Sequence, residues 1–417
     1  QKLTKDDSFS PQPRRTTLKK IYEIESGELI DEAIITYFQS PQSFTGEDVI
    51  EIAPHGSPVI LRQIIDNCLK LDARMAEAGE FSLRALMNGR MNLSQAEAIR
   101  DLIDAQTVAS ARQSIRQLRG EFSRQLQPLK DKLLNVIVIL ESTLEFVEDD
   151  LPDYQAGEIK QNLRDIADDL GNLASTFKAG KLLREGLKVA FVGRPNVGKS
   201  SIFNALLGHE RAIVTDIAGT TRDSLHEKLV IKNIPISLID TAGLRETSDT
   251  VESIGVERTK QTFADADLVV VVLDSSQDFT VEDQQILDET KELNRIIVSN
   301  KIDLNNSEFR VPKFAFVKFS AKTKEGIVDL ENAILEPFQL RETDSSGFLV
   351  TDARHHDLLR RAKNDIENSL QLLDQKMSEE IVLIGLHNAI RYLGEITGET
   401  TTEDMLTRIF STFCIGK

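Results

Sequence analysis

The chain has 417 residues, of which 40% are hydrophobic and 28% are charged, and its formal net charge at pH 7 is -17. This length accommodates two or three domains, and the composition excludes a mainly disordered chain. No apolar stretch approaches the roughly 18 residues of a membrane-spanning helix and no signal peptide is present, so we expect no membrane partner. The acidic balance argues against broad nonspecific nucleic-acid binding, and two cysteines are too few for a disulfide framework, which favours a cytoplasmic location.

Residues 1–85 combine strand and helix signals. Short apolar runs at 34–38 and 48–52 predict strands, and 58–71 predicts a helix. We therefore expect a small α+β domain here. The residues expected on the apolar side of the helix are Ile60, Leu61, Ile64, Ile65 and Cys68.

Long helices are predicted from about residue 86 to 185. Apolar residues recur in steps of three and four from Leu129 to Val147, which marks one helical face. The same spacing returns in three further segments: 161–183, 357–373 and 381–396. A segment with a different sequence pattern separates the helical parts 86–185 and 343–417. We therefore expect a domain inserted into a helical domain.

Residues 186–342 alternate apolar strands with helical stretches. The predicted strands are 187–192, 236–240, 268–273 and 295–299. Nearly continuous apolar strands joined by helices are typical of a parallel sheet covered on both faces, so this segment predicts an α/β domain.

A phosphate-binding signature follows the first of these strands. Gly193–Ser200 (GRPNVGKS) matches G-x-x-x-x-G-K-[ST], with a strand before it and a helix after it. Its backbone N–H groups converge on phosphate oxygens, Lys199 brings a positive charge to the β- and γ-phosphates, and the Ser200 hydroxyl serves Mg²⁺. The residues expected around the phosphates are Asn196, Val197, Gly198, Lys199, Ser200 and Ser201.

Three further motifs complete the pattern of a guanine-nucleotide site. The carboxylate of DTAG (240–243) anchors the Mg²⁺ shell, and Asp303 in NKID can accept two hydrogen bonds from guanine, which adenine does not offer. Ser320-Ala321-Lys322 fits the loop behind the base. Together with the phosphate-binding signature, these motifs resemble G1, G3, G4 and G5 of Ras-like GTPases. Asp303 in NKID argues against an ATPase. The expected binding residues are Asp240, Thr241, Ala242, Gly243, Asn300, Lys301, Asp303, Ser320, Ala321 and Lys322.

The segment 215–223 contains GTTRD, which resembles the switch I motif of GTPases. A threonine there reaches Mg²⁺ only when the γ-phosphate is present, so the segment predicts an order–disorder switch. The residues expected to contact the nucleotide are Thr215, Asp216, Ile217, Ala218, Gly219, Thr220 and Thr221.

The glutamine that orients the attacking water in Ras has no counterpart at the same position of this sequence. Leu244 stands where Ras-like enzymes carry the glutamine that orients water, and leucine cannot do this. We favour Glu252 for that role, with Glu246 and Asp249 as competitors. The Asn196 amide oxygen could hold a K⁺ ion in place of an arginine finger, or it could be an ordinary loop hydrogen-bonder. If no K⁺ acts, the candidate arginines are Arg194, Arg222 and Arg245.

Several motifs outside this domain carry a closer resemblance. They are FTGED (44–48), PHG (54–56), GEF (79–81), NGRMNLSQAE (88–97) and the terminal CIGK (414–417). With these motifs, the chain closely resembles the MnmE (TrmE) family of tRNA-modification GTPases. A ribosome-assembly GTPase is the rival interpretation, which the acidic chain and the inserted topology disfavour.

The resemblance implies a K⁺-stimulated GTPase acting with a FAD-dependent MnmG-type partner. Together they form an aminomethyl or carboxymethylaminomethyl group at C5 of the wobble uridine of certain tRNAs. It also implies a homodimer through the N-terminal domain, which binds 5,10-methylenetetrahydrofolate (5-formyltetrahydrofolate is an analogue). The family's Gly-rich first strand is absent from this sequence, and since the chain does not begin with Met, we expect residues upstream.

The resemblance also implies roles for particular residues. The K⁺ ligands of the family match Asn196, Thr215, Ile217 and Thr220, and its Mg²⁺ ligands match Ser200 and Thr221. Glu252 matches the water-orienting glutamate, and the folate contacts match Glu51, Arg90 and Lys417.

Three further residues are considered next. Cys414 and His55 each have a functional and a structural interpretation, and Cys68 has only a structural one. Cys414 could supply a thiolate that attacks uracil C6 or carries a one-carbon group, or it could pack the tail. His55 could cap a turn or contact folate. Cys68 lies on the apolar helix side and is expected in the core.

Overall fold

The computed structural model describes residues 1–145, 153–209, 226–240, 266–304, 316–338, 347–400, 402–413 and 416. These residues divide into two compact units: residues 1–100, 117–127 and 390–417 form the first, and residues 101–116 and 128–389 form the second. In the described parts, no helix is both long and apolar enough to span a bilayer.

The first unit begins with a three-stranded antiparallel sheet. Its strands, in spatial order, are β1 (Thr16–Tyr22), β2 (Leu29–Phe38) and β3 (Val49–Ala53). Helix α1 (Pro58–Leu69) covers one face, where Ile64 packs against Ile21, Ala33 and Ile35. The two predicted strands and the helix are confirmed, whereas β1 is not predicted by the sequence analysis.

The apolar side expected for α1 needs a correction. Ile60, Ile64 and Cys68 face the sheet, but Leu61 and Ile65 are 41% and 42% exposed. Buried Asn67 takes their place, because its Oδ1 accepts a hydrogen bond from Ile24 N at 3.1 Å. An exposed apolar residue on a helix is common and carries no conclusion by itself.

In the rest of the first unit, residues 83–96 pack against residues 406–413 near the C-terminus. Leu93 and Ala96 pack against Phe410 and Phe413 near the C-terminus. Gly79 closes the junction: its φ is +68°, and a Cβ there would lie 2.8 Å from Phe410 O, so only glycine fits. The helices concerned are α2 (Glu80–Met87), α3 (Leu93–Ile103) and α14 (Glu403–Phe410).

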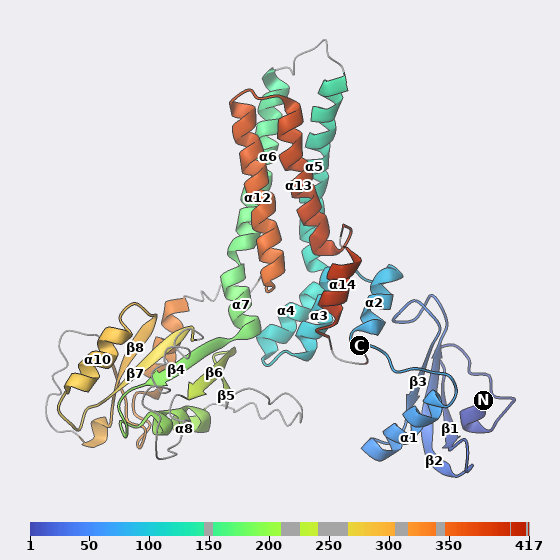
Figure 1. Ribbon diagram of the computed structural model, residues 1–417, viewed down its shortest axis with the longest axis horizontal. Helices are drawn as coiled ribbons and strands as arrows, with labels where there is room; N and C mark the ends of the chain where they lie inside the picture. Colours follow the sequence, from blue (N-terminus) through green and yellow to red (C-terminus); the bar gives the residue numbers. More distant parts are fainter. Residues whose placement is uncertain are drawn as a thin grey trace. The chain divides into compact units, whose positions relative to one another are not determined.

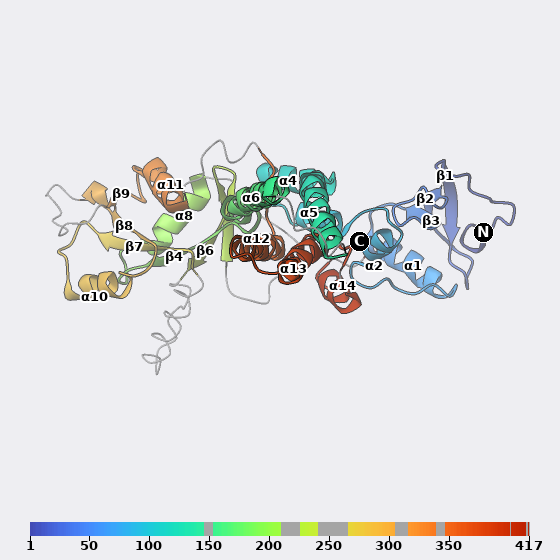
Figure 2. The same ribbon diagram turned by 90° about the horizontal axis from the view of Figure 1, so that it is seen from above.

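Four long helices lie side by side in both views (Figures 1 and 2). They are α5 (Glu121–Glu145), α6 (Asp153–Ser175), α12 (Ala353–Asp374) and α13 (Glu379–Thr397). Helix α6 packs along α12, although the six-stranded sheet lies between them in the sequence. The predicted helix 161–183 is interrupted at Thr176, after which α7 (Phe177–Glu185) leads to the sheet, and α4 (Val108–Leu118) precedes the bundle.

A six-stranded sheet occupies the other end of the second unit. In spatial order its strands are β5 (His226–Ile231), β6 (Ile234–Asp240), β4 (Leu187–Val192), β7 (Leu268–Asp274), β8 (Arg295–Asn300) and β9 (Val317–Lys318). All neighbours are parallel except β5 and β6. The expectation of an all-parallel sheet is therefore corrected at this edge, where a two-residue turn joins β5 to β6 and forces an antiparallel pair.

Helices cover both faces of this sheet (Figure 2). Helices α8 (Lys199–His209) and α11 (Ile327–Leu335) pack on one face and α10 (Val281–Glu289) on the other. Every residue of β7 is buried, as expected for a strand covered on both sides. Because β6 and β7 lie on opposite sides of β4, the loop after β4 opens at the switch point of the sheet, where ligands bind in such folds.

Candidate functional site

The loop between β4 and α8 has backbone geometry that requires glycine at two positions. A Cβ on Gly193 (φ +154°) would lie 2.4 Å from Val272 O, and one on Gly198 (φ +99°) would lie 2.2 Å from Asn300 Nδ2. Asn196 adopts the left-handed conformation (φ +64°) that asparagine tolerates, and it is exposed. The loop is thus held tightly against β7 and the end of β8.

Lys199 begins α8 and turns back over this loop. Its Nζ donates hydrogen bonds to Gly193 O and Arg194 O, both at 2.8 Å. Ser200 and Ser201 follow in the exposed first turn of the helix. A lysine at this place, beside backbone N–H groups at a helix N-terminus, fits a polyphosphate.

Asn300 ties the loop to the end of β8. It is fully buried, its Nδ2 donates to Val197 O at 2.9 Å, and its Oδ1 accepts from Ala321 N at 3.2 Å. Its carbonyl accepts from Ser275 Oγ at 2.7 Å. Asn300 therefore joins the phosphate loop, β8 and the segment after β9 in one network.

Lys301 makes the second tie. Its Nζ donates to Asn196 O at 2.8 Å and to the carboxylate of Asp274 at 2.6 Å. Burial raises the pKa of Asp274, but the Lys301 ammonium and Ser276 outweigh it and hold that pKa below its usual range. Asp274 was not among the predicted site residues, although its place at the end of the apolar run LVVVVLD was a usable signal.

The groups predicted for the base lie together. Asp303 is exposed, and its Oδ1 accepts from Ser320 Oγ at 2.7 Å, which fixes the carboxylate. Ser320 is itself fully buried and accepts from Thr323 N at 3.1 Å. Lys322 is exposed beside them. A fixed, exposed carboxylate next to the phosphate loop suits the paired N–H donors of guanine.

The remaining predicted nucleotide contacts are described only in part. Asp240 ends β6 beside Phe191 of β4, so the DTAG motif starts at the same edge of the sheet as the phosphate loop. The other predicted residues lie outside the described residues: Thr215, Asp216, Ile217, Ala218, Gly219, Thr220, Thr221, Thr241, Ala242, Gly243 and Glu252, and also Cys414 and Lys417.

The predicted folate contacts Glu51 and Arg90 are both exposed in the first unit. Glu51 pairs with Thr36 in the sheet register, on the face that α1 leaves uncovered. Arg90 packs its side chain against Gly46, where an added Cβ would lie 3.3 Å from Arg90 Cγ. No contact between Glu51 and Arg90 is observed among the described interactions.

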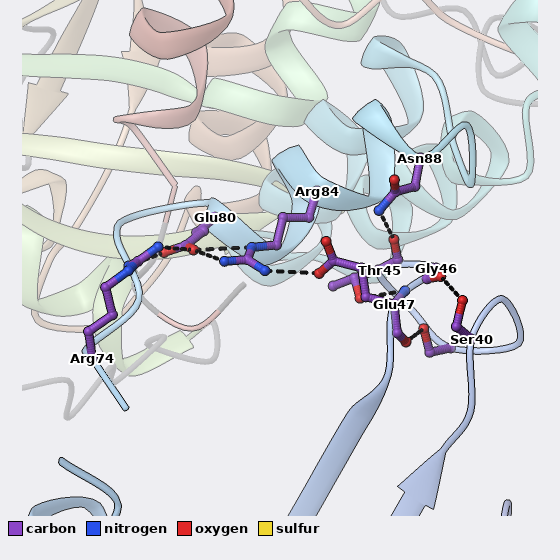
Figure 3. Close-up of polar contacts among 9 residues, drawn as sticks. Ser40, Thr45, Gly46, Glu47, Arg74, Glu80, Arg84 and Asn88 are labelled. Carbon is purple, nitrogen blue, oxygen red and sulfur yellow. Dashed lines mark hydrogen bonds and ion pairs between the residues drawn. The ribbon is translucent and has the colours of Figure 1, made fainter. Parts of the chain in front are cut away.

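An ion-pair network holds the loop Thr45–Glu47 (Figure 3), and Gly46 of this loop is the residue that Arg90 packs against. The Glu80 carboxylate accepts hydrogen bonds from Arg74 and Arg84 at 2.6 Å, and Arg84 reaches on to Glu47 at 2.9 Å. The Arg74 bond, the Glu77 N–H and Arg84 together lower the pKa of Glu80 to about 2. Asn88 Nδ2 donates to Thr45 O at 2.8 Å, so α2 and its end fix the loop Thr45–Glu47.

The structure also describes His55 and Cys68. The His55 N–H and ring Nδ1 both contact Asp31 at 2.8 Å, while the side chain stays 77% exposed, an arrangement that fits the turn-capping interpretation. Cys68 packs against the small core as predicted, and burial raises the pKa of its thiol.

The fold and the site define the class of protein. A glycine-dependent phosphate loop after β4, tied by Asn300 and Lys301 to an exposed Asp303, is the constellation of a P-loop GTPase. The profile of the MnmE helical domain matches residues 93–414, and that of the TrmE N-terminus matches residues 1–90. The chain belongs to the MnmE (TrmE) family of tRNA-modification GTPases.

Two relatives are similar to this chain over nearly its whole length. The tRNA modification GTPase MnmE of Aquifex aeolicus (strain VF5) is 45% identical over 97% of this chain and 91% of its own. Its namesake in Koribacter versatilis (strain Ellin345) is 44% identical over 97% and 89%. Among solved structures, the G domain of the T. maritima FeoB iron transporter is 30% identical over 37% of this chain and 99% of its own, with a TM-score of 0.29.

Proposed function

We propose that this chain is a K⁺-stimulated GTPase whose cycle drives modification of the wobble uridine in certain tRNAs. With a FAD-dependent MnmG-type partner it forms an aminomethyl or carboxymethylaminomethyl group at C5, using the one-carbon unit of 5,10-methylenetetrahydrofolate. The family relationship supports this, and one observation carries the choice of nucleotide: Asp303 is held by Ser320 beside a phosphate loop anchored by Asn300.

The chain's own residues would divide the work. Lys199 and the loop amides bind the phosphates, Asp303 recognises guanine, and Glu252 orients the attacking water. Ser200 and Thr221 would hold Mg²⁺, and Asn196 with Thr215, Ile217 and Thr220 would hold K⁺. The exposed, left-handed Asn196 fits a cation ligand, since its amide is not used within the described loop contacts. A bound K⁺ would supply positive charge near the β–γ bridge.

The organisation proposed for the whole protein follows the family. Residues 1–85 form the folate-binding and dimerisation domain, and Glu51, Arg90 and Lys417 contact the folate. Residues 186–342 form a GTPase domain inserted between the helical parts 86–185 and 343–417; the packing of α6 on α12 supports this division. A homodimer in the cytoplasm that joins two partner subunits is proposed, and Cys414 is kept as a candidate nucleophile.

One experiment tests the proposal as a whole. The purified chain is incubated with the flavoprotein partner, unmodified tRNA, GTP, methylenetetrahydrofolate, and either glycine or ammonium, in KCl or in NaCl at equal ionic strength. We expect GTP hydrolysis and a wobble-uridine mass increase in KCl and little of either in NaCl, because neutral oxygen ligands favour the larger, weakly hydrated ion. Equal hydrolysis in both salts would remove K⁺ from the proposal, and unmodified tRNA in KCl would remove the folate-dependent step.

A further inference from the structure

Arg194 is a charged phosphate-loop residue to which the proposed chemistry gives no role. Its Nε donates a hydrogen bond to Asp283 Oδ1 of α10 at 2.8 Å. The two side chains are only 15% and 3% exposed, so this is a largely buried ion pair rather than a surface contact. The guanidinium therefore points into the protein, toward α10.

The carboxylate of Asp283 is fixed from its other side. Asp283 is the third residue of α10, and its Oδ2 accepts from both N and Oγ1 of Thr280 at 3.0 Å. Thr280 Oγ1 accepts in return from Asp283 N, which completes a capping box. Because Leu287 anchors the same helix in the core, the carboxylate that faces Arg194 is held on a rigid element.

The main chain of Arg194 lies next to the catalytic machinery. Its carbonyl accepts a hydrogen bond from Lys199 Nζ at 2.8 Å. Two residues further on, Asn196 O is held by Lys301. The phosphate loop is thus braced on one side by the end of β8 and on the other by α10, with Asn196 and Lys199 between the two braces.

We infer that Arg194 and Asp283 form a positioning pair that sets the phosphate loop for hydrolysis, and that Arg194 does not act as an intrinsic arginine finger. The pair fixes the first half of the loop, while Asn300 and Lys301 keep the second half in place. Loss of the pair therefore disturbs the alignment of Lys199 and Asn196 more than it disturbs nucleotide binding. The inference requires only the GTPase activity that family membership gives, and not K⁺ or folate.

The test compares Arg194→Met, Asp283→Asn and the double variant in the full chain. We expect kcat for GTP to fall between about tenfold and about 100-fold in each, the range for a small misplacement of reacting groups. The dissociation constant for GDP should change less than about threefold. The double variant should lose no more than the worse single variant, since both remove one interaction. Arg194→Lys, which restores a cation, should recover part of the loss.

Other outcomes overturn the inference. If Arg194→Met loses activity while Asp283→Asn keeps it, Arg194 acts on the nucleotide directly. Unchanged kcat in both variants would leave the pair without a catalytic role, and an equal loss of kcat and GDP affinity would make it a structural contact. Asp288→Asn, on the exposed side of α10, is the matched control and should behave like the wild type. If the wild type itself hydrolyses no GTP, the assigned activity fails instead of the pair.

Discussion

Three residues of the NKID motif differ in burial and in the contacts that they make. Asn300 is buried and links backbone segments, Lys301 joins the phosphate loop to Asp274, and Asp303 is exposed. Of the three, Asp303 is the most exposed, and its carboxylate is the group that suits the N–H donors of guanine. Substitutions at the first two positions are thus expected to disturb the site's architecture, whereas a substitution at Asp303 changes its specificity.

Asp303→Asn is expected to shift preference from GTP toward XTP. The amide offers a donor where guanine also presents a donor, so about 3 kcal/mol of GTP affinity is lost, as for charge-assisted hydrogen bonds. Xanthine presents an acceptor there and matches the amide. Competition of GTP and XTP against a fluorescent nucleotide measures the effect, and unchanged GTP affinity would show that Asp303 does not contact the base.

The start of α2 depends on the charge of Glu80. Its side chain is 14% exposed and accepts hydrogen bonds from Arg74, Arg84 and Glu77 N. Because the folded state lowers the pKa of Glu80 from 4.5 to about 2, the stabilisation is present above pH 4.5 and is lost as the pH falls toward 2.

Glu80→Gln should therefore weaken the first unit at neutral pH by about 1 kcal/mol, a modest value because the network borders solvent. Hydrogen exchange of the α2 amides in variant and wild type measures the difference. We expect a clear difference at pH 7 that shrinks between pH 4.5 and pH 2. A difference that stays constant over this range would mean that packing, and not charge, stabilises the start of α2.

Helix α7, which leads into β4, makes a close backbone contact with the segment just before α12. A Cβ on Gly180 would lie 2.1 Å from Val350 O, and Arg184 Nη1 donates to Asp352 at 2.7 Å. The two segments that flank the six-stranded sheet in sequence thus meet at this helix. Glycine is required here because backbone lies against backbone, where no side chain can move aside.

Gly180→Ala should lower the free energy of unfolding by about 2 kcal/mol, as expected for overpacking. Gly157→Ala in α6 is the matched control: among the described residues, no atom outside the backbone of its own helix lies within 4 Å of the added Cβ, so the better helix propensity should raise stability by about 0.5–1 kcal/mol. Urea unfolding monitored by circular dichroism gives both values. Equal effects of the two substitutions would contradict the close contact at Gly180.

At the scale of the whole molecule, the two proposed sites belong to different compact units. Glu51 and Arg90 lie in the first unit, and the phosphate and base loops lie in the second. We therefore expect a local change in one site to leave the fold of the other intact.

Glu51→Ala should abolish binding of 5-formyltetrahydrofolate while GTP hydrolysis in KCl stays within about twofold of wild type. A side chain on an exposed sheet position carries little packing energy, so a large loss reports the ligand contact. Isothermal titration with the folate and a phosphate-release assay give the two readouts. Loss of both activities would contradict the independence of the sites.

The sequence alone determined the local chemistry of this protein. The phosphate loop, the strands before DTAG and NKID, and the long amphipathic helices follow from motifs and periodicities that act over a few residues. Only the tertiary structure decided the antiparallel edge strand β5, the break at Thr176, and the partners of Arg194 and Asp274. These depend on residues far apart in the chain: Asp283 is 89 positions from Arg194. No local pattern specifies which buried carboxylate a given cation meets, because packing of whole helices and strands decides which charges come together.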